Sequence, residues 1–109
     1  MAYDERVARR VRTALKRYPA VVEKKMFGGL VFMQQGNMCC GVIGEDLMIR
    51  LDPEEYDNAL SQPHTRVMES NGKPFTGFVY VAPAGLARPS DLKRWIALAA
   101  RYVLLLTPK

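Results

Sequence analysis

Residues 21–51 consist of short apolar stretches separated by tight-turn sequences, and this alternation restricts the fold more than any other feature of the chain. The apolar stretches cover residues 21–27, 30–34, 38–43 and 47–51. The turn sequences between them contain Gly28-Gly29, Gln35-Gly36-Asn37 and Gly44-Glu45-Asp46. Short strands joined by short turns are typical of an antiparallel meander, so we expect four consecutive strands here.

Three helices are predicted around these strands. Residues 3–18 carry apolar side chains at spacings of three and four, which is the pattern of an amphipathic helix that ends before Pro19. Asp52-Pro53-Glu54-Glu55 predicts a helix start, with Asp52 as the cap and Glu55 completing a capping box, and this helix ends near Leu60. Ser90 is expected to cap a long third helix over residues 91–106.

Two further strands are predicted over residues 66–69 and 77–82, with a tight turn at Asn71-Gly72 between them. The expected order is therefore α-β(4)-α-β(2)-α. This order indicates an α+β fold with two layers, an antiparallel sheet packed by helices. A chain of 109 residues has the size of one domain, so we expect residues 1–109 to form a single unit.

Composition and charge limit the class of protein. Hydrophobic residues make up 49% and charged residues 25%, which is usual for a globular domain and excludes a disordered chain. The N-terminus lacks the apolar stretch of a signal peptide, and the apolar residues 95–106 are too few to cross a membrane, so a cytoplasmic protein is expected. The net charge is +5, and residues 1–18 alone carry six Lys or Arg against two acids.

The sequence Lys25-Met26-Phe27-Gly28-Gly29 is similar to the signature of the TfoX/Sxy family N-terminal domain. The likeness continues in order through Gly36-Asn37-Met38-Cys39-Cys40, Gly72-Lys73-Pro74 and Trp95. The resemblance implies a compact domain with an antiparallel sheet and no established catalytic residues. Some members regulate natural competence genes together with the cyclic-AMP receptor protein and carry a second, C-terminal domain. The present chain ends at Lys109 and is expected to be a single-domain member.

The first predicted helix has a basic face opposite its apolar stripe. The cations on this face are Arg6, Arg9, Arg10, Arg12, Lys16 and Arg17. Such a face can contact the phosphates of nucleic acid, can bind an acidic protein partner, or can simply be solvated. No aromatic residues alternate with these cations, so the pattern does not favour stacking on single-stranded nucleic acid.

Two other groups of residues have the composition of anion sites. A strand rather than a helix follows Gly28-Gly29, so these glycines are expected to form a bulge or tight turn and not a phosphate loop. Lys25, Arg50, Arg66 and Lys73 would form an anion pocket if the sheet brought them together. Ordinary surface charge and ion pairing is the default reading of these four residues, and the pocket is the alternative.

No metal or cofactor is expected. Cys39 and Cys40 are adjacent, lack the spacer of a zinc site, and are expected to point to opposite faces of a strand as buried apolar residues. His64 is the only histidine and is expected in a loop. No catalytic constellation occurs, so the chain is predicted not to be an enzyme, with an uncharacterised sheet-pocket activity as the less favoured alternative.

The third predicted helix carries two apolar stripes. One stripe contains Leu92, Ile96, Ala99, Val103 and Leu106, and the second contains Trp95, Leu98, Tyr102 and Leu105. Either the first helix covers the second stripe, or that stripe is a homodimer or partner interface with Trp95 and Tyr102 as anchors. Together these patterns predict a binding or regulatory module that contacts a protein partner or itself. Direct nucleic-acid binding and small-ligand binding are the alternatives.

Overall fold

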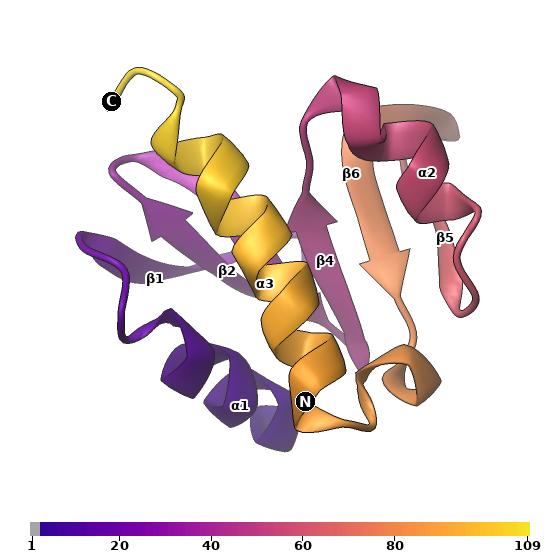
Figure 1. Cartoon of the computed structure of the whole chain (residues 1–109), viewed down its shortest axis with the longest axis horizontal. Coiled ribbons are helices and arrows are strands. Elements are labelled where there is room, and N and C mark those ends of the chain that lie inside the picture. The colour runs from indigo at the N-terminus through magenta and orange to yellow at the C-terminus, as the bar shows by residue number, and fades with distance from the viewer. Residues whose placement is uncertain (1–2) are drawn as a thin grey trace.

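A computed structural model describes residues 3–109 as one antiparallel sheet with helices packed on it (Figure 1). The strands are β1 (Val21–Met26), β2 (Gly29–Gln34), β3 (Asn37–Ile43), β4 (Asp46–Arg50), β5 (Thr65–Ser70) and β6 (Lys73–Val81). They lie in the order β1-β2-β3-β4-β6-β5, and every neighbouring pair is antiparallel. The α+β class and the order α-β(4)-α-β(2)-α are confirmed.

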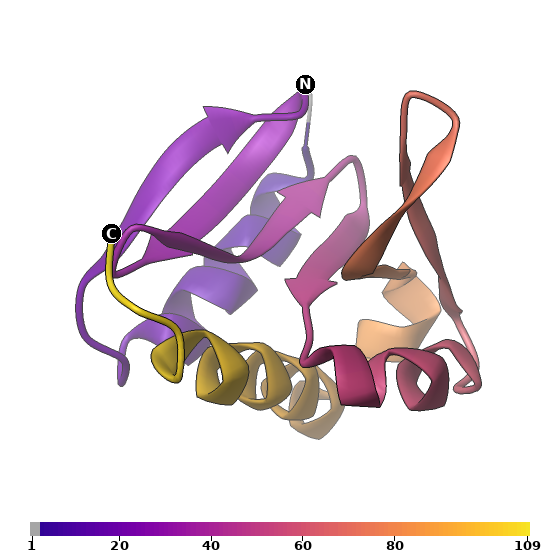
Figure 2. The same ribbon diagram turned by 90° about the horizontal axis from the view of Figure 1, so that it is seen from above.

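The helices are α1 (Glu5–Leu15), α2 (Tyr56–Leu60) and α3 (Pro89–Leu104). Two short 3₁₀ turns, Pro53–Glu55 and Pro83–Leu86, lead into α2 and α3. Seen from above, the helices lie on one side of the sheet, and its other side stays uncovered (Figure 2). Within residues 3–109, no helix combines the length and apolarity that a membrane crossing requires.

Side-chain caps explain where α1 and the 3₁₀ turn before α2 begin. One carboxylate oxygen of Asp4 accepts hydrogen bonds from the backbone N–H groups of Arg6 (2.8 Å) and Val7 (3.2 Å), so α1 begins at Glu5 and not at Tyr3. Tyr3 instead forms a bridge with Gly44. Asp52 is a cap as predicted, but of the 3₁₀ turn Pro53–Glu55: its carboxylate accepts from the Glu54 N–H at 2.9 Å, and α2 itself begins at Tyr56 without a side-chain cap.

The start of α3 differs from the prediction. Ser90 is not the cap: Arg88 occupies that position without a side-chain cap bond, and Pro89 is the first helical residue. Proline suits this position because its fixed φ matches the helix and the missing N–H would have no helical partner there. The helix ends at Leu104, two residues before its predicted end.

The turn between β1 and β2 is formed by Phe27 and Gly28. Both have positive φ, 54° and 73°, as a tight two-residue hairpin turn requires. Gly29 already belongs to β2 and lies so close to β3 that an added Cβ would collide with the carbonyl oxygen of Val42. A tight turn is therefore confirmed, but it lies at Phe27-Gly28, one residue before the expected Gly28-Gly29, and a strand rather than a helix follows it.

The two faces of the sheet carry separate apolar clusters. Residues of α1 and α3 pack with one set of strand side chains, including Leu30, Phe32 and Ile49, to form the main core. The second cluster contains strand residues and no helix residue, so it lies on the uncovered face. Its buried members are Val31, Met48, Met68 and Phe78, and its partly buried members are Met26, Met33, Met38, Ile43, Phe75 and Tyr80.

A β-bulge corrects the prediction for the two cysteines. Phe32 pairs with Cys40 and Met33 pairs with Met38, so Cys39 is an additional residue on β3. The bulge interrupts the alternation of side chains, and Cys39 and Cys40 both lie in the helix-side core. Their expected placement on opposite faces is wrong, whereas their expected burial is confirmed.

Candidate binding groove

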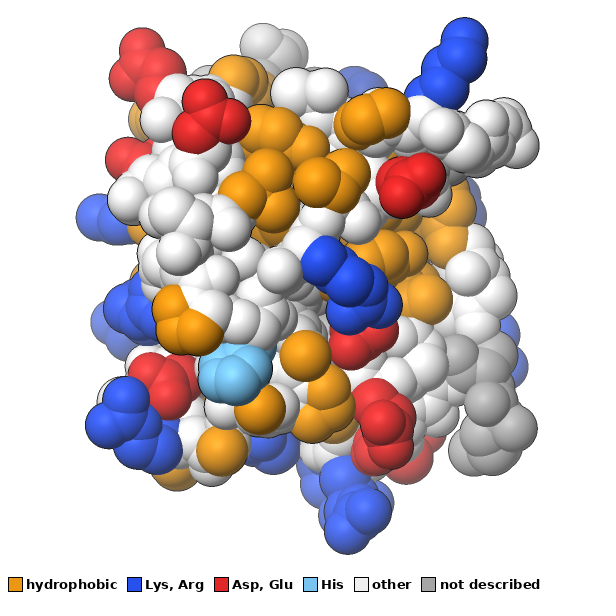
Figure 3. All heavy atoms as spheres, turned by 90° about the vertical axis from the view of Figure 1, so that its right-hand side faces the viewer, with side chains coloured by type: hydrophobic (Ala, Val, Ile, Leu, Met, Phe, Trp, Pro, Cys, Tyr) orange, Lys and Arg blue, Asp and Glu red, His pale blue; other side chains and the backbone are white. Residues whose placement is uncertain are grey.

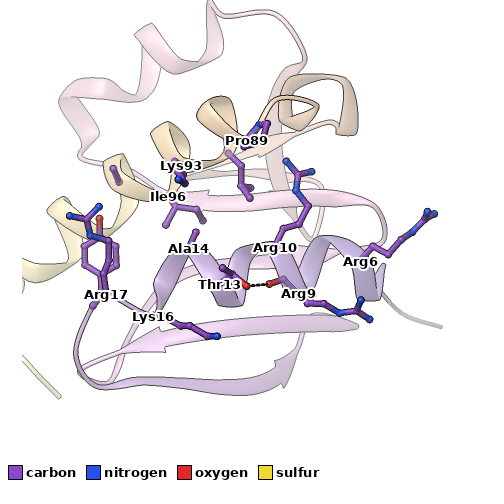
Figure 4. A pocket seen from close by; sticks show the side chains of 13 residues that line it. Arg6, Arg9, Arg10, Thr13, Ala14, Lys16, Arg17, Pro89, Lys93 and Ile96 are labelled. Atoms are coloured by element: carbon purple, nitrogen blue, oxygen red, sulfur yellow. Dashed lines mark hydrogen bonds between the residues drawn. The ribbon is translucent and has the colours of Figure 1, made fainter.

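A groove of about 780 Å³ runs between α1 and α3. Its apolar lining comes from both helices, and Ala14 of α1 faces Ile96 of α3 across it (Figure 4). The other apolar side chains in the lining are Tyr18, Pro89, Leu92 and Ala97. The helices are held at this spacing because their opposite faces, with Val11 and Val103 among them, share the main core.

Cations surround this apolar lining. Five of the six residues predicted on the basic face contribute to the groove, namely Arg6, Arg9, Arg10, Lys16 and Arg17. Lys93 of α3 is a sixth cation, which the sequence-based set does not include. Among residues 3–109, no carboxylate lies within 4.0 Å of Arg6, Arg9, Lys16, Arg17 or Lys93 to form an ion pair. The groove is therefore an apolar trough with a positive rim.

Arg10 has a different role from the other groove cations. Its Nη2 donates a hydrogen bond to the carbonyl oxygen of Leu86 at 2.5 Å, and Figure 4 shows the side chain directed toward the start of α3. This bond joins α1 to the 3₁₀ turn that precedes α3. Arg10 therefore fixes one end of the groove, and part of its hydrogen-bonding capacity is already used.

Arg12 does not line the groove, contrary to its place in the predicted basic face. Its Nε and Nη2 donate to the two carboxylate oxygens of Glu23 at 2.5 Å and 2.8 Å, which links α1 to β1. The hydrogen bond to Arg12 lowers the pKa of Glu23, and the same bond raises the pKa of Arg12. Arg12 is thus a structural link and not a groove cation.

The alternative of an anion pocket is not borne out, because its four cations lie apart. Lys25 lies on β1 at one end of the sheet, whereas Arg66 and Lys73 lie on β5 and β6 at the other end. Arg66 forms an ion pair with Asp46 at 2.5 Å, and this hydrogen bond raises the pKa of Arg66. The guanidinium of Arg50 lies 5.6 Å from the ring centre of Phe78 and 3.4 Å from the carbonyl oxygen of Met38. The four cations are therefore separate.

The second stripe of α3 is largely internal. Trp95 is 1% exposed and belongs to the main core, and Leu98 and Tyr102 are partly buried against it. Only Leu105 is widely exposed, at 82%. The prediction that α1 covers this stripe is wrong, because α1 lies beside Leu92 and Ile96 of the first stripe. Trp95 cannot serve as the exposed anchor of an interface.

The cysteines and the histidine form no joint site. A hydrogen bond with Cys39, and after it burial, raises the pKa of the Cys40 thiol well above its ordinary value. A buried thiol of this kind is unreactive. His64 is exposed and is the pale blue side chain in Figure 3. Over the part of the chain that the structure describes, no three His, Cys, Asp or Glu side chains are grouped to hold a metal ion.

The contribution of α3 to the groove is not evident from the sequence alone. Lys93, Pro89 and Ala97 line it together with Leu92 and Ile96. A helical wheel of α3 places Lys93 next to Ile96, between Ile96 and Ala97. This grouping identifies Lys93 as a groove residue only once α1 is known to pack beside it.

Most of this structure is similar to one known protein family. The model of the family described as TfoX N-terminal domain matches residues 13–102, which include all six strands and most of α3. Arg6, Arg9 and Arg10 lie before the matched range. No curated protein and no solved structure matches the chain. The matched range is far more than half of the chain and contains the signature at Lys25-Met26-Phe27-Gly28-Gly29, so the chain belongs to the TfoX N-terminal domain family.

Proposed function

We propose that this domain is a binding module whose α1–α3 groove holds an acidic, amphipathic helix of a partner protein. The observation that carries the proposal is the combination of apolar residues in the trough with cations around it. An amphipathic helix places apolar side chains in such a trough at helical spacing, as in other helix-in-groove complexes. Its acidic side chains then face the cations of the rim.

Each part of the groove supplies a different property of binding. Burial of the partner's apolar side chains against Ala14, Leu92 and Ile96 supplies affinity, at about 25 cal/mol for each Å² of apolar surface removed from water. The cations that have no carboxylate partner in the described chain select acidic partners and speed their association. A regulatory role through protein contacts, which the family resemblance implies, is compatible with this mode of binding.

Catalysis is not part of the proposal. The groove lining contains no carboxylate, imidazole or thiol, and its only hydroxyl groups belong to Thr13 and Tyr18. The Thr13 hydroxyl donates to the carbonyl oxygen of Arg9 at 3.0 Å. The lining therefore offers contacts for recognition without a general base or an activated nucleophile.

Direct binding of duplex nucleic acid is the second candidate, and the number of cations on α1 favours it. Two features favour the protein partner instead. Arg10 and Arg12 already donate to Leu86 and Glu23, which reduces the cations available for phosphates. The apolar floor between the helices also has no counterpart in a phosphate backbone, which needs donors and positive charge.

A fluorescence-anisotropy titration tests the proposal. The probes are a labelled helical peptide with Leu at helical spacing and Glu elsewhere, the same peptide with Gln for each Glu, and a labelled duplex DNA. We expect the Glu peptide to bind at least about tenfold more tightly than the Gln peptide, and the DNA to bind only at the weak level of non-specific contacts.

Protein variants locate the site. Ala97→Glu adds a carboxylate within the trough and Lys93→Glu reverses a rim charge, so both should weaken binding of the Glu peptide. Arg101→Glu is the matched control, because Arg101 is exposed on α3 and does not line the groove. Equal loss in all three variants, or tighter binding of DNA than of the peptide, would contradict the proposal.

A further inference from the structure

The β1 strand leaves one edge of the sheet open. It is the end strand in the sheet order, and its pairing with β2 is continuous from Val21 to Met26. Four consecutive side chains of β1, from Val22 to Lys25, are exposed. The side chain of Val22 is 63% exposed, and an exposed apolar residue on an open edge strand favours pairing with another chain.

The opposite edge of the sheet is less suited to pairing. There β5 carries a register shift between Val67 and Glu69, and a bulge of this kind twists an edge and disrupts its ladder. Figure 3 looks onto this side of the molecule and shows acidic and basic side chains spread between the hydrophobic ones. The regular, uninterrupted edge is therefore that of β1.

We propose that β1 pairs antiparallel with β1 of a second copy of this chain, which joins the two sheets into one. A two-fold axis perpendicular to the sheet relates the copies and keeps the uncovered faces on the same side. Two residues that lie opposite each other in this arrangement point to the same face of the sheet, so both have odd numbers or both have even numbers. The two-fold axis must therefore pass through a residue of β1 and not between two residues.

Charge selects the register centred on Lys24. In that register Glu23 lies opposite Lys25 of the second copy, and the symmetry forms this opposite-charge pair twice. Val22 lies opposite Met26 of the second copy, so the exposed valine gains an apolar neighbour, also twice. The one unfavourable contact is between the two Lys24 side chains at the axis, where long side chains can separate.

The registers centred on Glu23 or on Lys25 place less favourable pairs of side chains opposite each other. A centre at Glu23 places like carboxylates opposite each other and sets Val22 against Lys24 of the second copy. A centre at Lys25 sets Lys24 against Met26 and leaves Glu23 without a cation. Glu23 can accept from a second donor while bound to Arg12, because a carboxylate has about four acceptor sites.

A charge-exchange experiment tests the pairing in solution. Light scattering over a concentration series should show twice the mass of one chain for the wild type. Lys25→Glu should be monomeric, because it places two carboxylates opposite each other. Glu23→Lys should also be monomeric, because it places two ammonium groups opposite each other. An equimolar mixture of the two variants should recover the double mass, because each strand then carries the charge that the other lacks. Lys73→Glu, the same change on β6, is the control and should stay dimeric.

Cross-linking tests the register. Lys24→Cys places two thiols at the axis, where opposite Cα atoms of an antiparallel pair lie about 5 Å apart and a disulfide can form. Val22→Cys is the matched control, because its two copies are offset by about 13 Å along the strands. We expect a disulfide-linked dimer to form with Lys24→Cys and not with Val22→Cys. A wild type that stays monomeric at every concentration, or equal cross-linking of both cysteine variants, would overturn the proposal.

Discussion

Arg10 and Leu86, which are 76 positions apart in the chain, are joined by a hydrogen bond from the Arg10 guanidinium to the Leu86 carbonyl oxygen. The bond connects the middle of α1 to the turn that leads into α3. It therefore couples the basic segment of the chain to the helix on the other side of the groove, and it distinguishes Arg10 from the cations beside it.

Arg10→Ala should destabilise the fold by about 1 kcal/mol, because a partly buried carbonyl oxygen loses its charged donor. Urea unfolding followed by circular dichroism measures the change. Arg9→Ala is the matched control on the same helix, since the Arg9 side chain is exposed, and it should stay within about 0.5 kcal/mol of the wild type. If both substitutions lower the free energy of unfolding equally, the hydrogen bond of Arg10 contributes nothing to stability.

Glu23→Gln should show a pH-dependent effect on stability. The pKa of Glu23 is lowered in the fold by its hydrogen bond to Arg12. The ionised carboxylate therefore stabilises the protein above the pKa of the unfolded chain, and this contribution disappears as the pH falls through the lower pKa of the folded protein. The pair is partly exposed, so the contribution is under about 1 kcal/mol. Urea unfolding at about pH 7 and about pH 3 should show a gap between wild type and variant that closes in acid. A gap that widens in acid would contradict this reading.

Gln34→Met should stabilise the protein. Gln34 is fully buried on β2, and neither its amide nitrogen nor its amide oxygen has a hydrogen-bond partner among residues 3–109. An unpaired buried amide costs about 1–3 kcal/mol, and methionine fills a similar volume without that cost. A rise in Tm would support this account. A fall would indicate that a water molecule satisfies the amide in solution.

Gly29→Ala should be more damaging than Gly28→Ala. An added Cβ at Gly29 meets the Val42 carbonyl oxygen and the Ile43 side chain, so β2 and β3 must separate at a cost of about 3 kcal/mol. Gly28 has open space around it, and alanine there costs about 1 kcal/mol through the positive φ alone. The ranking of the two urea midpoints checks this expectation, and a reversed ranking would contradict the assigned role of Gly29.

Trp95→Ala should lower stability by about 3–5 kcal/mol, as expected for a large core side chain. Leu105→Ala, at the exposed end of the same stripe, should change it by less than about 0.5 kcal/mol. Both free energies come from denaturant unfolding. Near-wild-type stability of the Trp95 variant would be inconsistent with its place in the core.

The sequence allowed the order of elements to be predicted because the relevant signals are local. Turn residues such as Gly28 and Gly36, and the cap at Asp52, determine the backbone conformation only within a few residues of their own positions. The errors concern features that depend on distant residues. The bulge at Cys39 arises from its pairing with β2, and the separation of Lys25 from Arg66 follows from the strand order. The groove was only half predictable, since the α1 cations were evident and the contribution of Lys93 required the packing of α1 on α3.

The uncovered face of the sheet holds every internal methionine, at positions 26, 33, 38, 48 and 68, while the helix-side core contains none. Methyl-labelled methionine would therefore give an NMR spectrum in which each internal signal reports on that face. A ligand in the α1–α3 groove should leave these five signals in place. Pairing through β1 should move the signal of Met26, and a partner on the open face should move several of them together.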